Sequence, residues 1–70
     1  MALELIDKIV KNIEKKRKTL GWSVDHLSKE SDISFSTLTK IRLKEVADVR
    51  VSTLLAIAGA LGCTLDELVG

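Results

Sequence analysis

Apolar residues recur at helical spacing along most of the chain, and small polar residues or glycines separate the repeats. The first repeat predicts a helix over residues 3–19, because its apolar positions follow one another at steps of three and four. Its expected buried stripe comprises Ile6, Ile9, Val10, Ile13 and Arg17. Leu20 and Gly21 end this helix, since glycine adopts the left-handed backbone that commonly follows a helix at little cost.

Two short helices with similar beginnings are predicted next. Ser23 is placed to cap a helix from about 24 to 31, and Ser34 to cap one from about 35 to 43. Each cap is flanked by the two apolar residues of a hydrophobic staple, which are Trp22 with Leu27 and Ile33 with Leu38. The short turn between them leaves Asp32 as the residue expected to take a left-handed conformation.

A fourth helix is predicted over residues 51–61 and a short fifth helix over residues 65–69. Gly62 closes the fourth, and Thr64 and Glu67 have the spacing of a capping box for the fifth. The apolar stripe of the fourth helix is expected to comprise Val51, Leu54, Leu55, Ala58 and Leu61. In the segment 43–50, the residues expected to face inward are Val46 and Val49.

This pattern predicts an all-α, compact five-helix fold in which residues 1–70 form a single domain. The composition agrees, since 46% of the residues are hydrophobic and proline is absent. One cysteine excludes an internal disulfide, and no apolar run approaches the length of a membrane span, so we expect a soluble cytoplasmic protein. We expect no metal, cofactor or small-molecule ligand, because Cys63 and His26 do not form a ligand cluster.

The distribution of charge is more informative than the net charge of +1. Basic residues gather on the first helix and again after the third. They are Lys8, Lys11, Lys15, Lys16, Arg17 and Lys18, followed by Lys40, Arg42, Lys44 and Arg50. One interpretation is a basic face that meets an anionic partner, and the other is an ordinary solvated helix surface.

Two stretches together resemble the Cro/cI-type, lambda-repressor-like helix-turn-helix family, also called the XRE family. The stretch KKRKTLGWSVDHLSKESDISFSTLTKI is similar to the run from the end of the family's first helix through its recognition helix. The stretch VSTLLAIAGALGCTLDELV is similar to its last two helices. The resemblance places the helix-turn-helix at about residues 23–42.

The resemblance implies sequence-specific binding of double-stranded DNA by a small, repressor-like transcriptional regulator. The recognition helix, at about residues 35–43, would enter the major groove. Its expected base contacts are Phe35, Ser36, Thr39 and Lys40. The expected phosphate contacts are Lys16, Ser23, Val24, Ser34, Arg42, Lys44 and Arg50, either through side-chain charge or through amides at helix N-termini.

Several residues depart from the family pattern. Val24 stands where members usually carry glutamine, Ser28 where they carry alanine, and Asp32 where they carry the turn glycine. The family's glutamate near the end of the third helix is Arg42, so its usual ion pair with the first-helix arginine, here Arg17, cannot form.

Two arginines facing each other would be destabilising if buried without a counter-charge. We therefore expect Arg42 to point outward, toward phosphate, or one of the two arginines to pair with Glu45 or Asp48.

The family resemblance also implies a homodimer on a two-fold operator. Its surface would be the C-terminal region of Leu65, Leu68 and Val69, joined by Leu3 and Leu5, unless these five residues are simply core. An alternative function is a protein-interaction module that keeps the scaffold without its DNA contacts. We do not expect an enzyme, because no residue spacing suggests a catalytic triad or a phosphate-binding loop.

Overall fold

The computed structural model describes residues 2–70, and all the regular structure in this range is helical. The five helices are α1 (Leu3–Thr19), α2 (Val24–Ser31), α3 (Phe35–Arg42), α4 (Val51–Leu61) and α5 (Leu65–Val69). The predicted all-α, five-helix, lambda-repressor-like fold is confirmed. Four helices have the predicted bounds, and α3 ends one residue earlier than expected.

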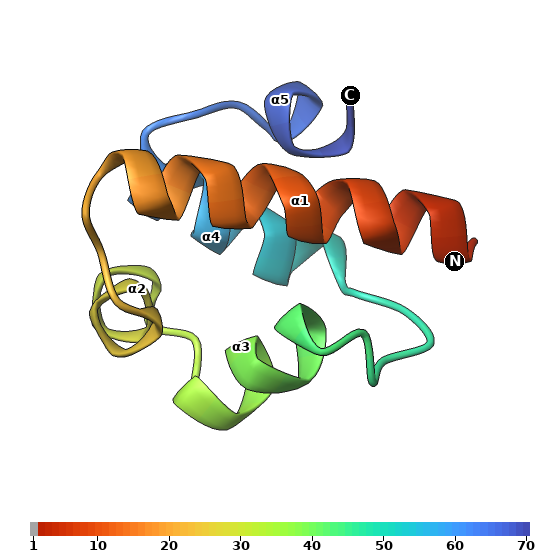
Figure 1. Cartoon of the computed structure of the whole chain (residues 1–70), viewed down its shortest axis with the longest axis horizontal. Helices are drawn as coiled ribbons and strands as arrows, with labels where there is room; N and C mark the ends of the chain where they lie inside the picture. The colour runs from red at the N-terminus through yellow and green to blue at the C-terminus, as the bar shows by residue number, and fades with distance from the viewer. Residues whose placement is uncertain (1) are drawn as a thin grey trace.

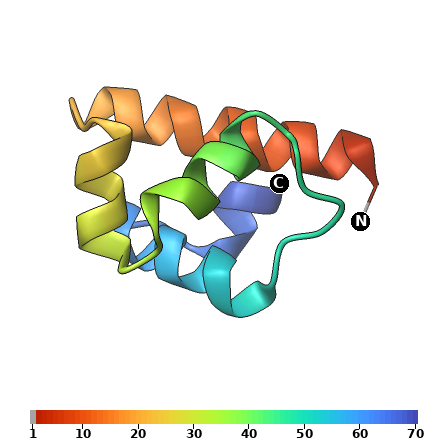
Figure 2. The same ribbon diagram turned by 90° about the horizontal axis from the view of Figure 1, so that it is seen from below.

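The long helix α1 separates the other elements into two groups (Figure 1). α2 and α3 lie on one side of it and α5 on the opposite side, while α4 lies behind it in this view. In the view from the α2–α3 side, α1 and α4 form opposite edges of the molecule, and α3 lies between them toward the viewer (Figure 2). The pair α2 and α3 therefore forms one face of the domain, and α4 forms a lateral edge of that face.

Local hydrogen bonds explain why the helices begin and end at these residues. The Ser23 hydroxyl accepts a bond from the His26 amide at 3.0 Å, and the Ser34 hydroxyl accepts one from the Thr37 amide at 3.1 Å. The capping box of Thr64 and Glu67 is formed at the start of α5. The expected left-handed residues after α1 and α4 are also confirmed, with φ of 72° at Gly21 and 70° at Gly62.

The core is made by one apolar stripe from each helix. The predicted stripe of α1 is confirmed for its four apolar members, and Arg17 lies beside it half-buried. The buried apolar residues are Ile6, Ile9, Val10, Ile13, Leu27, Leu38, Ile41, Val49, Leu54, Ile57, Ala58, Leu61 and Leu68. Val46 is half-buried and packs against this cluster, so both inward valines of the segment after α3 are placed as expected.

The predicted buried face of α4 was wrong by part of a turn. Val51 is 59% exposed and Leu55 is 53% exposed, although both were expected in the stripe, whereas Ile57 is fully buried. Leu54, Ala58 and Leu61 face the core as predicted. The two stripes share these three residues, so the spacing alone allows either one. Packing against α2 and α5 selects the stripe that contains Ile57.

The C-terminal residues expected at a dimer surface belong mostly to the core. Leu68 is fully buried, and its carbonyl accepts a 2.7 Å hydrogen bond from the Asn12 side chain of α1. Leu5, Leu65 and Val69 are partly buried against the same cluster. Leu3 is the exposed member of the five, at 74%. Leu68 is therefore not available to a second chain, which corrects that part of the prediction.

Candidate nucleic-acid interface

The turn between α2 and α3 is fixed by serine side chains as well as by its backbone. Asp32 has φ of 59° and ψ of 26°, which confirms the expected left-handed conformation. The Ser28 hydroxyl donates to the Ile33 carbonyl at 2.6 Å, and the Ser31 hydroxyl donates to the Leu27 carbonyl at 2.7 Å. Ser28, which stands in the place of the family's alanine, thus ties α2 to the residue before the α3 cap.

Three of the four predicted base-contacting residues project from the outer side of α3. Phe35 is 51% exposed, and Ser36 and Lys40 are also exposed. Leu38 and Ile41, on the other side of the helix, are buried against the core. A helix that is polar on one side and anchored on the other can present its outer side chains to a partner without losing its seat.

Thr39 is placed differently from the other three. It is half-buried, and its hydroxyl is buried without a hydrogen-bond partner among the residues that the structure describes. A buried hydroxyl cannot reach a base edge from this position. Two exposed residues of this region were not predicted, namely Thr37, which bonds the Ser34 hydroxyl at 2.8 Å, and Leu43 just after α3. The helical spacing of Leu43 from Ser36 and Lys40 was a usable signal for it.

The two helix N-termini differ in how well they suit an anion. Unbonded amides at a helix N-terminus favour negative charge. α2 carries Asp25 in its first turn, whereas α3 has no acidic residue there. The N-terminus of α3, behind the Ser34 cap, is therefore the better phosphate site of the two.

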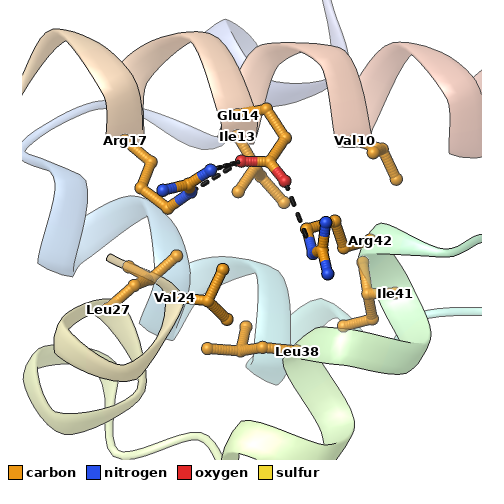
Figure 3. Close-up of a pocket in the computed structure, with 9 residues that line it drawn as sticks. All are labelled: Val10, Ile13, Glu14, Arg17, Val24, Leu27, Leu38, Ile41 and Arg42. Carbon is orange, nitrogen blue, oxygen red and sulfur yellow. Dashed lines mark hydrogen bonds and ion pairs between the residues drawn. The ribbon is translucent and has the colours of Figure 1, made fainter. Parts of the chain in front are cut away.

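One carboxylate serves both arginines that were expected to repel each other (Figure 3). Glu14 of α1 accepts a 2.6 Å hydrogen bond from Arg17 Nε, and its other oxygen lies 3.7 Å from Arg42 Nε. Arg17 also donates to the Trp22 carbonyl at 2.6 Å. This corrects the prediction that Glu45 or Asp48 would supply the pairing acid, and Glu14 joins α1 to the end of α3.

A cavity of about 20 Å³ lies beneath this bridge, among α1, α2 and α3 (Figure 3). Val24 lines it together with Leu27, Leu38 and Ile41, so the valine that replaces the family's glutamine contributes an apolar wall. Its side chain is half-buried against the core. Val24 can therefore meet a phosphate through its backbone amide and not through its side chain.

The remaining candidate phosphate contacts do not all lie on the α2–α3 face. Lys16 projects toward α5, where its ammonium lies 3.1 Å from a Glu67 carboxylate oxygen, and this hydrogen bond is the main cause of the lowered pKa of Glu67. Lys44 pairs with Asp7 from a left-handed backbone, with φ of 61°. Arg50 lines a shallow groove with Thr37 of α3. Lys16 is thus separated from α3 by the body of α1 (Figure 1).

The two residues considered for chemistry have structural surroundings. His26 is exposed, with its ring edge against Trp22 at a centroid distance of 4.6 Å and its Nε2 3.7 Å from Glu30. Cys63 is half-buried, and burial raises the pKa of its thiol. Within residues 2–70, no three His, Cys, Asp or Glu side chains gather as metal ligands would. In the same range, no helix has the length and apolar character needed to cross a bilayer.

Comparison with known families assigns the chain. The sequence model of the Cro/C1-type HTH DNA-binding domain matches residues 12–70, which include α2, α3, α4, α5 and the second half of α1. The chain belongs to this family, and the predicted resemblance is confirmed. Membership supports DNA binding by a regulator-like protein with double-stranded DNA as its partner, in a family that is not one of enzymes. Searches among curated proteins and among solved structures give no significant match.

Proposed function

We propose that the protein is a small, repressor-like transcriptional regulator that reads a specific sequence in duplex DNA with α3 in the major groove. The observation that carries this proposal is the outer side of α3, where Phe35, Ser36 and Lys40 are exposed on a helix whose other side is anchored in the core. A major groove admits an α-helix presented in this way.

Each exposed residue has a role that its chemistry allows. The Lys40 ammonium can donate to guanine O6 or N7, and the Ser36 hydroxyl can donate to or accept from several bases. The Phe35 ring can contact a thymine methyl group. Thr39 receives no hydrogen-bonding role, because its hydroxyl is buried.

Phosphate contacts are assigned to groups that can reach the same face. They are the α3 amides behind Ser34, the α2 amides of Ser23 and Val24, and the side chains of Arg42, Lys44 and Arg50. Lys16 is left out, because it is paired with Glu67 on the far side of α1. Such contacts supply affinity and salt dependence but little sequence discrimination.

A titration of fluorescent random-sequence duplex with the protein at several salt concentrations tests the DNA-binding part of the proposal. We expect the logarithm of the binding constant to fall linearly with the logarithm of salt, by about 0.9 for each phosphate contacted. Selection of bound duplexes from a random pool then tests sequence specificity. No binding even at low salt would favour the alternative of a protein-interaction module, for which the exposed Phe35 ring would be the contact.

Lys40→Ala and Lys44→Asn should have different effects on a selected site. Loss of Lys40 should relax the preference at one base position at a cost of about 1–3 kcal/mol, because a base contact specifies sequence. Loss of Lys44 should weaken all sequences alike and reduce the salt slope by about 1. Asparagine is used at position 44 because it tolerates the positive φ of that residue. The reverse pattern in binding measured across single-base variants would refute these roles.

A further inference from the structure

The outward face of α4 is apolar and uncharged although it is open to solvent. It comprises Val51, Ser52, Leu55 and Gly59, all of which are exposed. Val51 and Leu55 are more than half exposed, at 59% and 53%. No residue of α4 carries a charge, whereas the outer faces of α1, α2 and α3 all do. Adjacent exposed apolar side chains on a helix without charges are a feature of contact surfaces.

We propose that this α4 face binds the same face of a second copy of the chain, with the two α4 helices packed antiparallel about a two-fold axis at Leu55. Val51, Leu55 and Gly59 are four residues apart, so they lie along one line on the helix. In an antiparallel pair centred on Leu55, Val51 of each copy faces Gly59 of the other. A large side chain then meets the position that has none, at both ends of the contact.

The space at Gly59 fits this arrangement. A Cβ atom built on Gly59 would meet no atom of the same chain within 4 Å, so the missing side chain leaves an open depression on the surface. Glycine in the middle of a helix lowers helix stability by roughly 0.5–1 kcal/mol relative to alanine, and nothing within this chain requires it here. The partner's Val51 gives the glycine a function that the single chain does not.

Electrostatic complementarity supports a second copy as the occupant. α4 begins after Arg50 with no acidic residue in its first turn, and it ends with no basic residue in its last turn. Neither end of its helix dipole is therefore compensated by its own side chains. Antiparallel packing places the positive end of each α4 beside the negative end of the other. The net charge of +1 adds little repulsion between copies.

The position of α4 also suits a two-fold pair. α4 lies along the edge of the face that carries α2 and α3 (Figure 2). A two-fold axis at this edge, directed along the line of sight of that view, leaves α3 of both copies on the same side of the dimer. An isologous contact of this kind closes on itself and gives dimers instead of chains. One helix face is smaller than the standard interface of about 800 Å² per partner, so we expect weak association.

Sedimentation equilibrium without DNA tests the surface. From about 1 μM to about 1 mM, a range suited to a weak interface, we expect the average mass to rise from monomer toward dimer. Leu55→Lys should weaken dimerisation at least about tenfold, because a side chain at the centre of an interface carries much of its energy. Leu3→Lys, at an exposed leucine of α1, is the matched control and should leave dimerisation unchanged. A protein that stays monomeric at the highest concentration, or a dimer that persists in Leu55→Lys, would overturn the proposal.

Two further variants test the geometry. Gly59→Gln should raise the melting temperature of the monomer, because glutamine is a better helix former, and should weaken the dimer by filling the depression. In a Cys63→Ala background, Leu55→Cys should form disulfide-linked dimers on mild oxidation, because residue 55 faces its own copy, while Leu3→Cys should not. Equal cross-linking of the two would contradict the two-fold at Leu55. DNA takes no part in these measurements, so their failure would leave the proposed DNA binding untouched.

Discussion

Replacing Ile57 by alanine should lower the free energy of unfolding by about 2–5 kcal/mol, the range for removing a fully buried branched side chain. Ile57 is completely buried in the face that α4 presents to the core. Small domains are stable by only about 5–15 kcal/mol, so a large share of the total would be lost. Urea denaturation followed by circular dichroism, at a protein concentration where the monomer dominates, measures the change.

Leu55→Ala is the matched control for this variant. It removes an aliphatic side chain from the same helix, two residues away, but from a position that is 53% exposed. We expect a change within about 0.5 kcal/mol, as for surface positions in general. If the two variants lost equal stability, the orientation of α4 described above would be incorrect.

Glu14→Gln should lower the free energy of unfolding by about 2–3 kcal/mol, somewhat less than the loss of one partner of a fully buried ion pair. Glutamine keeps the size of the side chain but removes the charge that faces Arg17 and Arg42. Arg17 is only 15% exposed, so its guanidinium cannot recover the lost interaction fully from water. Thermal and urea unfolding of the variant and the parent protein measure the difference.

Glu45→Gln is the control, because Glu45 is the acid that sequence reasoning considered as a partner for the arginines. It is exposed, so its neutralisation should change stability by less than about 0.5 kcal/mol. A larger loss for Glu45→Gln than for Glu14→Gln would mean that the arginines are paired differently in solution.

The parts of the fold that depend on neighbouring residues were predictable. Ser23, Ser34 and Thr64 cap helices through bonds to amides three residues ahead, so a short stretch of sequence contains all that determines these helix starts. Asp32 was the best candidate in a three-residue turn for a left-handed backbone, and it has one. The left-handed Lys44 had no comparable signal, since no glycine or asparagine marks the segment after α3.

The errors arose where the outcome depends on packing between distant segments. Alternative stripes on α4 share Leu54, Ala58 and Leu61, and only the neighbouring helices decide between Ile57 and the pair Val51 and Leu55. The pairing of Arg42 was missed because Glu14 lies far away in sequence. Its spacing of three residues before Arg17 on a helix was a usable signal for half of the bridge. Of the proposed base contacts, Thr39 could not be judged from spacing, because the burial of its hydroxyl depends on tertiary packing.

The Glu14 bridge also bears on how fast the protein finds DNA. By taking its acid from α1, the chain places a positive group, Arg42, at the end of α3 where family members carry a negative one. Long-range attraction to a phosphate backbone depends on the local field at the approaching surface, and it accelerates association most at low ionic strength. A nearly neutral domain can thereby be steered so that α3 approaches DNA first, with the balancing acid held behind that surface.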